Sequence, residues 1–108
     1  MAFELYQNKR TKKFYFRLLA KNKKTILQSQ GYKDKRGAKN GIKSVIKNAA
    51  AGSFEKKAAK DGSHYFVLRA KNNEIIGKSQ MYKTATGVSA GMRAVTNNAV
   101  NEIKEVEA

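Results

Sequence analysis

The stretch YFRLLAKN at Tyr15–Asn22 returns as YFVLRAKN at Tyr65–Asn72. A shift of 50 positions aligns 15–50 with 65–100 without a gap, and 16 of these 36 positions are identical. Self-similarity at a fixed spacing indicates that one supersecondary unit has been copied. The chain of 108 residues is therefore a tandem duplication, with a first copy over 1–51 and a second over 52–108. We expect the two copies together to form one compact domain.

Apolar side chains in each copy alternate at first with polar ones. Phe16, Leu18 and Ala20 share one side of an extended chain, as do their equivalents 50 residues later. Alternation with many aromatic and β-branched residues predicts strands. The expected strands lie at Phe3–Gln7, around 14–20 and around Thr25–Ser29 in the first copy, and at Phe54–Ala58, around 65–70 and around Ile75–Ser79 in the second.

The spacing of apolar residues becomes helical after Tyr32 and Tyr82. Asp34 and Thr84 suit the N-cap of a helix, and Gly52 suits the end of the first one. Each copy therefore reads β-β-β-α. The end of the second copy stays open: Ile103 and Val106 continue the helical series, whereas alternation over 103–107 favours a strand, and 101–108 could also be disordered.

The motifs A-K-N, S-Q-x-Y-K and G-I-K-S-V-I-K-N-A, within a β-β-β-α unit that begins Phe-Glu, resemble those of the YegP-like family. The resemblance covers nearly all of both copies and departs mainly at Met92–Val95. Its members look like single or tandem copies of one short domain. The resemblance implies an α+β fold, an antiparallel sheet with helices against it, and no activity, catalytic residue or ligand. We expect both helices on one face and a pseudo-twofold axis between the copies.

The composition argues against an enzyme. The chain has no Cys and a single histidine, His64, which excludes zinc–thiolate and iron–sulfur sites and sites that need several imidazoles. Glu4 and Glu55 are equivalent in the repeat and could approach one another across the axis, or each could carry the charge of a strand edge. No phosphate-binding loop, nucleophile elbow or metal-ligand spacing is present. We expect no metal, no cofactor and no catalytic residues.

Glycines recur at matching positions inside the two expected helices, as Gly37 and Gly41 in one and Gly87 and Gly91 in the other. A glycine inside a helix costs about 1 kcal/mol relative to alanine, so its recurrence needs a structural reason. We expect these four glycines to let the two helices approach one another closely. Close approach of each helix to the sheet is the alternative.

Positive charge is the only functional signal, and it is concentrated in the first copy. The formal net charge is +15; residues 1–50 hold 14 Lys and Arg against 2 acidic residues, and residues 51–108 hold 9 against 6. The candidate polyanion-binding residues are a ridge at successive i+4 positions, a set on the first hairpin, and a pair on the sheet face away from the core: Lys35, Lys39, Lys43 and Lys47; Lys9, Arg10, Lys12 and Lys13; Tyr15 and Arg17.

Two classes of function remain open. The first is a small non-enzymatic interaction or structural module with an unidentified protein partner. The second is sequence-independent binding of nucleic acid through the basic first copy, because such a field attracts polyanions. No run of apolar residues approaches the length of a membrane span. We expect a cytoplasmic protein that is a monomer or a weak dimer, with no membrane partner.

Overall fold

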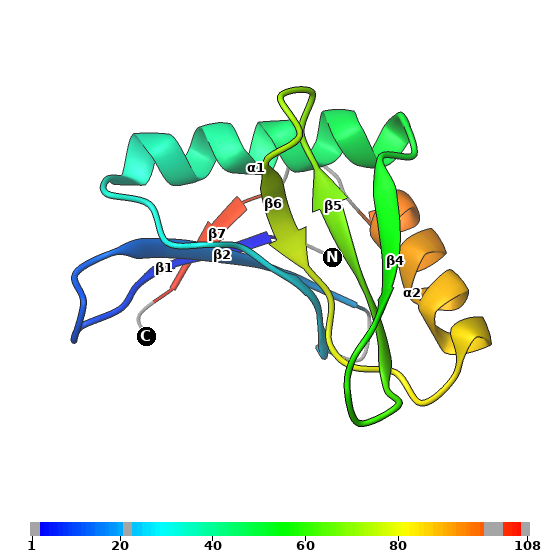
Figure 1. The fold of residues 1–108 in the computed structure, drawn as a ribbon. Helices are drawn as coiled ribbons and strands as arrows, with labels where there is room; N and C mark the ends of the chain where they lie inside the picture. Colours follow the sequence, from blue (N-terminus) through cyan, green and yellow to red (C-terminus); the bar gives the residue numbers. More distant parts are fainter. Residues whose placement is uncertain (1–2, 21–22, 99–102, 107–108) are drawn as a thin grey trace.

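The computed structural model describes residues 3–20, 23–98 and 103–106, and within them each copy is a β-β-β-α unit (Figure 1). The elements of the first copy are β1 (Phe3–Gln7), β2 (Phe14–Leu19), β3 (Thr25–Gln28) and α1 (Lys35–Ala50). Those of the second copy are β4 (Phe54–Ala58), β5 (His64–Arg69), β6 (Ile75–Lys78) and α2 (Ala85–Asn98). A last strand, β7 (Ile103–Glu105), follows α2. The expected β-β-β-α pattern is confirmed.

The seven strands form one sheet in the order β4-β5-β6-β3-β2-β1-β7. Every neighbouring pair is antiparallel except β1 and β7, which run parallel. The sheet is therefore mixed rather than purely antiparallel as expected. The open question at the C-terminal end is answered in favour of a strand for the described residues 103–106, because the backbone N–H of Val106 donates to the carbonyl oxygen of Leu5 at 2.9 Å; positions 101–102 and 107–108 lie outside the described residues.

The two copies meet where β3 pairs with β6. Gln28 lies opposite Lys78, and these residues are separated by the repeat length of 50 positions. When equivalent residues of two copies face one another in an antiparallel pair, a twofold axis passes between them. The expected pseudo-twofold relation is visible in this pair.

Leu27 and Gly77 break the symmetry beside that axis. They are equivalent in the repeat, and both lie buried on the helix-covered face. A methyl group on Gly77 would lie 2.7 Å from Cγ of Leu27, which is well inside van der Waals contact. A side chain of leucine size therefore fits at only one of the two positions.

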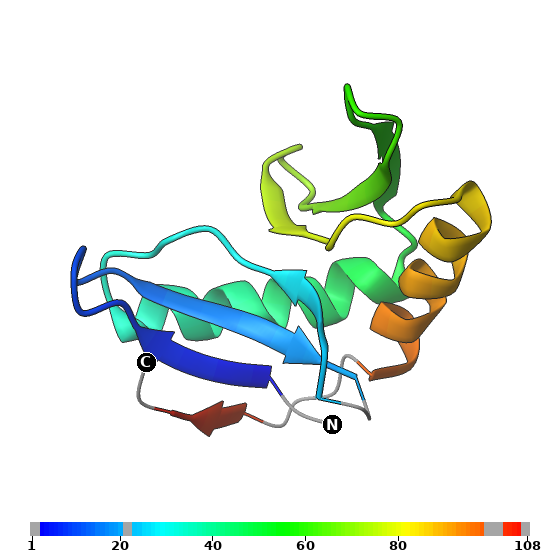
Figure 2. The same ribbon diagram turned by 90° about the horizontal axis from the view of Figure 1, so that it is seen from below.

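Both helices cover the same face of the sheet and close a single core. The sheet bends between β6 and β3 (Figure 2), so α1 contacts β5 and β6 of the other copy, and α2 contacts β2 and β3. The side chains that the core buries completely come from both copies: Phe3, Phe16, Leu18, Leu27, Ile42, Val45, Phe66, Leu68 and Val95. Burial of apolar surface is thus shared across the duplication.

Capping residues fix both helix starts. The Asp34 carboxylate accepts a hydrogen bond from the N–H of Gly37 at 2.7 Å, and the Thr84 hydroxyl accepts one from the N–H of Gly87 at 3.0 Å. Each contact satisfies a donor that a helix leaves unpaired at its first turn. Gly52 follows the end of α1 with φ +74°, a conformation that glycine adopts without strain.

The helix glycines face the sheet side, which makes the expectation of glycine-mediated helix–helix approach wrong. The ring of Tyr32 stacks on Phe16 with centroids 6.0 Å apart and ends against Gly41. Tyr82 and Gly91 repeat the arrangement. The helices do contact one another, but a side chain at these glycines would meet a tyrosine of the same copy. Burial there raises the pKa of the Tyr32 hydroxyl.

We expect Gly77→Leu to lower the free energy of unfolding by about 1–3 kcal/mol through overpacking against Leu27. Leu27→Ala alone should lower it by about 2–5 kcal/mol. Because the two side chains compete for one volume, the double variant should lose clearly less than the sum of the two. Urea unfolding of the four proteins measures these values, and additive losses would contradict the argument.

Gly41→Ala tests the tyrosine explanation of the helix glycines. The new methyl group would lie 2.8 Å from Cε2 of Phe16 and against the Tyr32 hydroxyl, so we expect a net loss of stability despite the better helix propensity of alanine. In a Tyr32→Leu background the clash with the hydroxyl is gone while that with Phe16 remains, so the same change should cost clearly less. Thermal or urea unfolding reports the size and sign of the effect in each background, and a stabilising effect in the wild-type background would refute the explanation.

Candidate polyanion-binding surface

The outward side of α1 is a row of basic side chains. Its inward side is apolar and buried, so the i+4 series of lysines and the neighbouring Arg36 remain on the surface. Successive residues four apart lie one above the other on a helix. The helix has no acidic residue in its sequence KRGAKNGIKSVIKNAA. Repulsion along the row is therefore not offset within the helix itself.

Three surface hollows connect this row to two loops. One, of about 340 Å³, is lined by Lys9 and Lys35 among others. The next, of about 440 Å³, lies on α1 between Lys35 and Lys43. The third, of about 470 Å³, contains Lys43 and Lys47 of α1 and Lys71 of the β5–β6 turn. Shared residues link the three hollows, and we call their basic residues the basic track: Lys9, Lys35, Arg36, Lys39, Lys43, Lys47 and Lys71.

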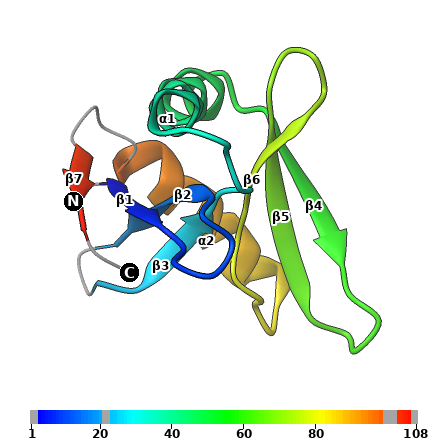
Figure 3. The ribbon, with the colours of Figure 1, turned by 90° about the vertical axis from the view of Figure 1, so that its left-hand side faces the viewer.

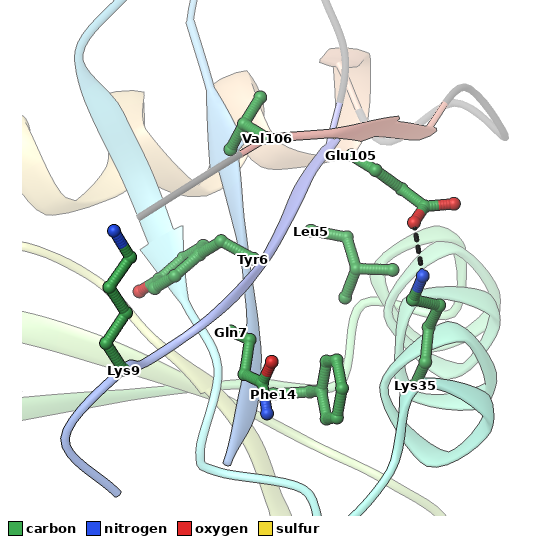
Figure 4. A pocket seen from close by; sticks show the side chains of 8 residues that line it. All are labelled: Leu5, Tyr6, Gln7, Lys9, Phe14, Lys35, Glu105 and Val106. Carbon is green, nitrogen blue, oxygen red and sulfur yellow. Dashed lines mark ion pairs between the residues drawn. The ribbon is translucent and has the colours of Figure 1, made fainter. Parts of the chain in front are cut away.

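Glu105 of β7 lies at one end of the basic track (Figure 4). Its carboxylate oxygens are 2.6 Å from Nζ of Lys35 and 3.7 Å from Nζ of Lys39. The hydrogen bond from Lys35 is the main cause that holds the pKa of Glu105 below its usual range. Among the described residues that line the three hollows, it is the only carboxylate. Glu105 therefore forms ion pairs with two of the four ridge lysines.

The hollow at Lys9 lies at the edge of β1, just past the end of β7. Leu5 and Phe14 project toward α1, whereas Tyr6 and Lys9 lie on the other side of β1 (Figure 4). The hollow is open and only partly apolar, and Lys9 and Lys35 lie on opposite sides of β1 (Figure 4), so it is an open part of the surface rather than an enclosed site. The other candidate residues of the first hairpin, Arg10, Lys12 and Lys13, are exposed in the β1–β2 turn.

Tyr15 and Arg17 lie on the opposite face of the sheet and do not join the basic track. The ring of Tyr15 stacks on Tyr6 with centroids 5.8 Å apart. The guanidinium of Arg17 lies 4.8 Å from the centre of the Tyr6 ring and donates to Glu4 at 2.8 Å. Both side chains are engaged within the sheet. They lie on the face away from the core, as expected, and their part in polyanion binding stays a prediction.

The two candidate carboxylates also lie apart, each in its own ion pair. Glu4 is bound by Arg17 of β2, and Glu55 by Arg69 of β5 at 2.7 Å, a hydrogen bond that lowers the pKa of Glu55. β1 and β4 lie on opposite sides of the β3–β6 junction. In the described part of the chain, no three His, Asp or Glu side chains gather where a metal ion could bind.

Two residues of the basic track, Lys71 and Arg36, were not among the candidates predicted from the sequence. Lys71 belongs to the second copy, yet its turn lies beside α1 because that helix packs across β5 and β6. Arg36 is adjacent in sequence to Lys35 and could have been included from the helical spacing. The α2 positions that match the four ridge lysines hold Ala85, Ser89, Arg93 and Asn97, so the second helix carries no comparable row.

Comparisons with known proteins agree on one family. A model described as "Domain of unknown function (DUF1508)" matches twice, over residues 10–55 and 59–105. A "UPF0339 protein in ptx operon 5'region" of Stutzerimonas stutzeri is 49% identical over 59 residues, which are 54% of this chain and 52% of that protein. The match thus spans about half the length of that relative.

Two solution NMR structures share the fold. One is the protein of unknown function yegP of E. coli, at 39% identity and a TM-score of 0.92, with 99% of this chain and 93% of that one covered. The other is a UPF0339 protein of Shewanella oneidensis, at 37% identity and a TM-score of 0.90, with 98% and 91% covered. Neither described helix is long and apolar enough to cross a membrane.

Proposed function

The chain belongs to the DUF1508 family of domains of unknown function, and from that premise we propose that it is a non-enzymatic binding module whose basic track holds the backbone of nucleic acid. The observation that carries the proposal is the continuity of the track. Seven basic residues from three separate elements line connected hollows that contain one carboxylate.

The dimensions of α1 suit a phosphate backbone. Its 16 residues extend about 24 Å at about 1.5 Å per residue, so ridge lysines four residues apart stand about 6 Å apart along the helix. Lysine ammonium groups on flexible stems contact phosphates as point charges. Such contacts position a protein on nucleic acid and carry no sequence information.

The kind of nucleic acid follows from what the track lacks. Single strands are held by aromatic rings on which bases stack, and α1 contains no aromatic residue. Tyr6 and Phe14 line the hollow at Lys9, but Tyr6 is already stacked on Tyr15 and contacted by Arg17, and Phe14 packs against the core. Tyr15, the aromatic candidate, stacks on Tyr6 on the far face of the sheet. We therefore infer that the ligand is double-stranded and is bound without regard to its sequence.

The absence of a chemical role for the acidic residues supports a binding module rather than an enzyme. General acid–base catalysis needs titratable groups whose environments drive their pKa values apart within one site. Glu4, Glu55 and Glu105 each face a basic side chain instead, in three different places. No cofactor is required for the proposed function.

Lys43→Gln with Lys47→Gln tests the track directly. The double variant should bind a labelled duplex of two helical turns roughly tenfold or more weakly at low salt, equally for unrelated sequences. The slope of log K against log salt concentration should become shallower by about 1.8, because two phosphate contacts of a duplex are lost. Fluorescence anisotropy over a salt series measures both quantities.

The matched control is Lys60→Gln with Lys83→Gln, which removes the same charge from exposed positions in the turns before β5 and α2. These turns lie away from α1 (Figure 1). The control should keep most of the affinity and nearly the full slope. Equal losses in the two double variants would show that net charge acts without a site, and no binding by the wild-type protein at about 50 mM salt would end the proposal.

Glu105→Gln should strengthen binding. The change removes the carboxylate from the track and releases Lys35 and Lys39 for phosphates, so the salt slope should become steeper by up to about 1.8. Asp61→Asn makes the same change of charge in the β4–β5 turn and should leave the slope unchanged. The same anisotropy titration reports both, and an equal gain from Asp61→Asn would contradict the role of the ion pairs.

A further inference from the structure

The two ends of the sheet differ. β7 covers the outer edge of β1, whereas β4 forms the opposite end of the sheet and has β5 as its only neighbour among the described strands (Figure 3). β1 and β4 are equivalent in the repeat, with Phe3 matching Phe54. The strand that completes one end of the pseudo-symmetric sheet thus has no described counterpart at the other.

The residues of β4 whose backbone groups point toward the free edge are the equivalents of those that do so in β1. The hydrogen bonds from Arg69 to Ser53 and from Ala59 to Ser63 show which residues of this antiparallel pair bond across the ladder. Because bonded and free residues alternate, Phe54, Lys56 and Ala58 direct their N–H and C=O groups outward. Leu5, the equivalent of Lys56, uses its carbonyl oxygen to bind β7.

A groove of about 400 Å³ runs beside this edge, between β4 and α2. Phe54 and Met92 line it and are only half-buried, whereas their equivalents Phe3 and Ile42 are fully buried in the first copy. The groove also contains Lys56 and Arg93, which are exposed. It therefore combines an apolar floor with two positive charges.

The register of β7 on β1 indicates what would fit. Ile103 lies opposite Phe3, Lys104 opposite Glu4, and Glu105 opposite Leu5. A segment placed on β4 in this register sets an apolar residue opposite Phe54 and an acidic one opposite Lys56, near Arg93. The residue between these two, at the position that corresponds to Lys104, then lies opposite Glu55. An apolar residue followed two positions later by an acidic residue is thus complementary to this edge.

We propose that the β4 edge is a docking site for an extended acidic segment of another protein, which adds to the sheet as a strand parallel to β4. Main-chain hydrogen bonds supply affinity in this mode of recognition, and alternate side chains supply specificity. A second copy of this chain is a poor occupant, because lysines on β4 oppose pairing with another lysine-bearing edge. The site is separate from the basic track.

The probe is a synthetic peptide, NEIKEVEA, which has the sequence of residues 101–108, added to the ¹⁵N-labelled full chain. We expect saturable NMR shifts of the amides of Phe54, Lys56, Ala58 and Arg93, with β1 and β7 unchanged. Lys56→Glu, at an exposed position, should weaken binding at least tenfold. The charge-swapped peptide NEIKKVEA should bind poorly to the wild-type protein and regain affinity for the Lys56→Glu variant.

Four outcomes would overturn the proposal. Shifts confined to α1 that disappear in the Lys43→Gln and Lys47→Gln double variant would place the peptide on the basic track. Shifts at β1 and β7 would mean that the peptide exchanges with the chain's own strand. Self-association with concentration that Lys56→Glu abolishes would assign the edge to a second copy, and no saturable shift at millimolar peptide would refute the site altogether.

Discussion

The antiparallel pairing of β3 with β6 is the contact on which the rest of the structure depends. It brings Gln28 opposite Lys78 and thereby turns two short three-stranded units into one continuous sheet. Each helix can then lie across strands of both copies, and side chains from both copies are buried in one core. A unit of about 50 residues has little apolar surface to bury by itself, so the shared core supplies what each copy lacks.

The repeat and the periodicity of its side chains were sufficient to predict most of the fold. Alternation predicted the three strands of each copy, and Asp34 and Thr84 were correctly expected to cap the helices. The glycines were misjudged because spacing on a helix shows which residues share a side but not which neighbour that side meets. A bulky Tyr32 in the preceding loop fills the space, and only the folded chain places it there.

Only part of the candidate surface could be predicted from the sequence, because some of its residues are brought together by tertiary packing. The ridge on α1 depends on helical spacing alone and was visible in the sequence. The contribution of Lys71 depends on the packing of α1 across strands of the other copy. The contacts of Tyr15 with Tyr6 and of Arg17 with Glu4 depend on the register of β1 and β2. Ion pairing of Glu105 with the ridge depends on β7, whose parallel pairing with β1 has no local signature.

The unequal pair beside the axis has a consequence for the pairing of the two copies. A homodimer of a single unit would place two copies of one residue at this point. Two leucines like Leu27 would collide, as the 2.7 Å separation from Gly77 shows, and two glycines like Gly77 would leave a void in the core. In one chain the two equivalent positions can carry different residues, as Leu27 and Gly77 do. A separated half would therefore be poorly suited to pair with a second copy of itself through this strand.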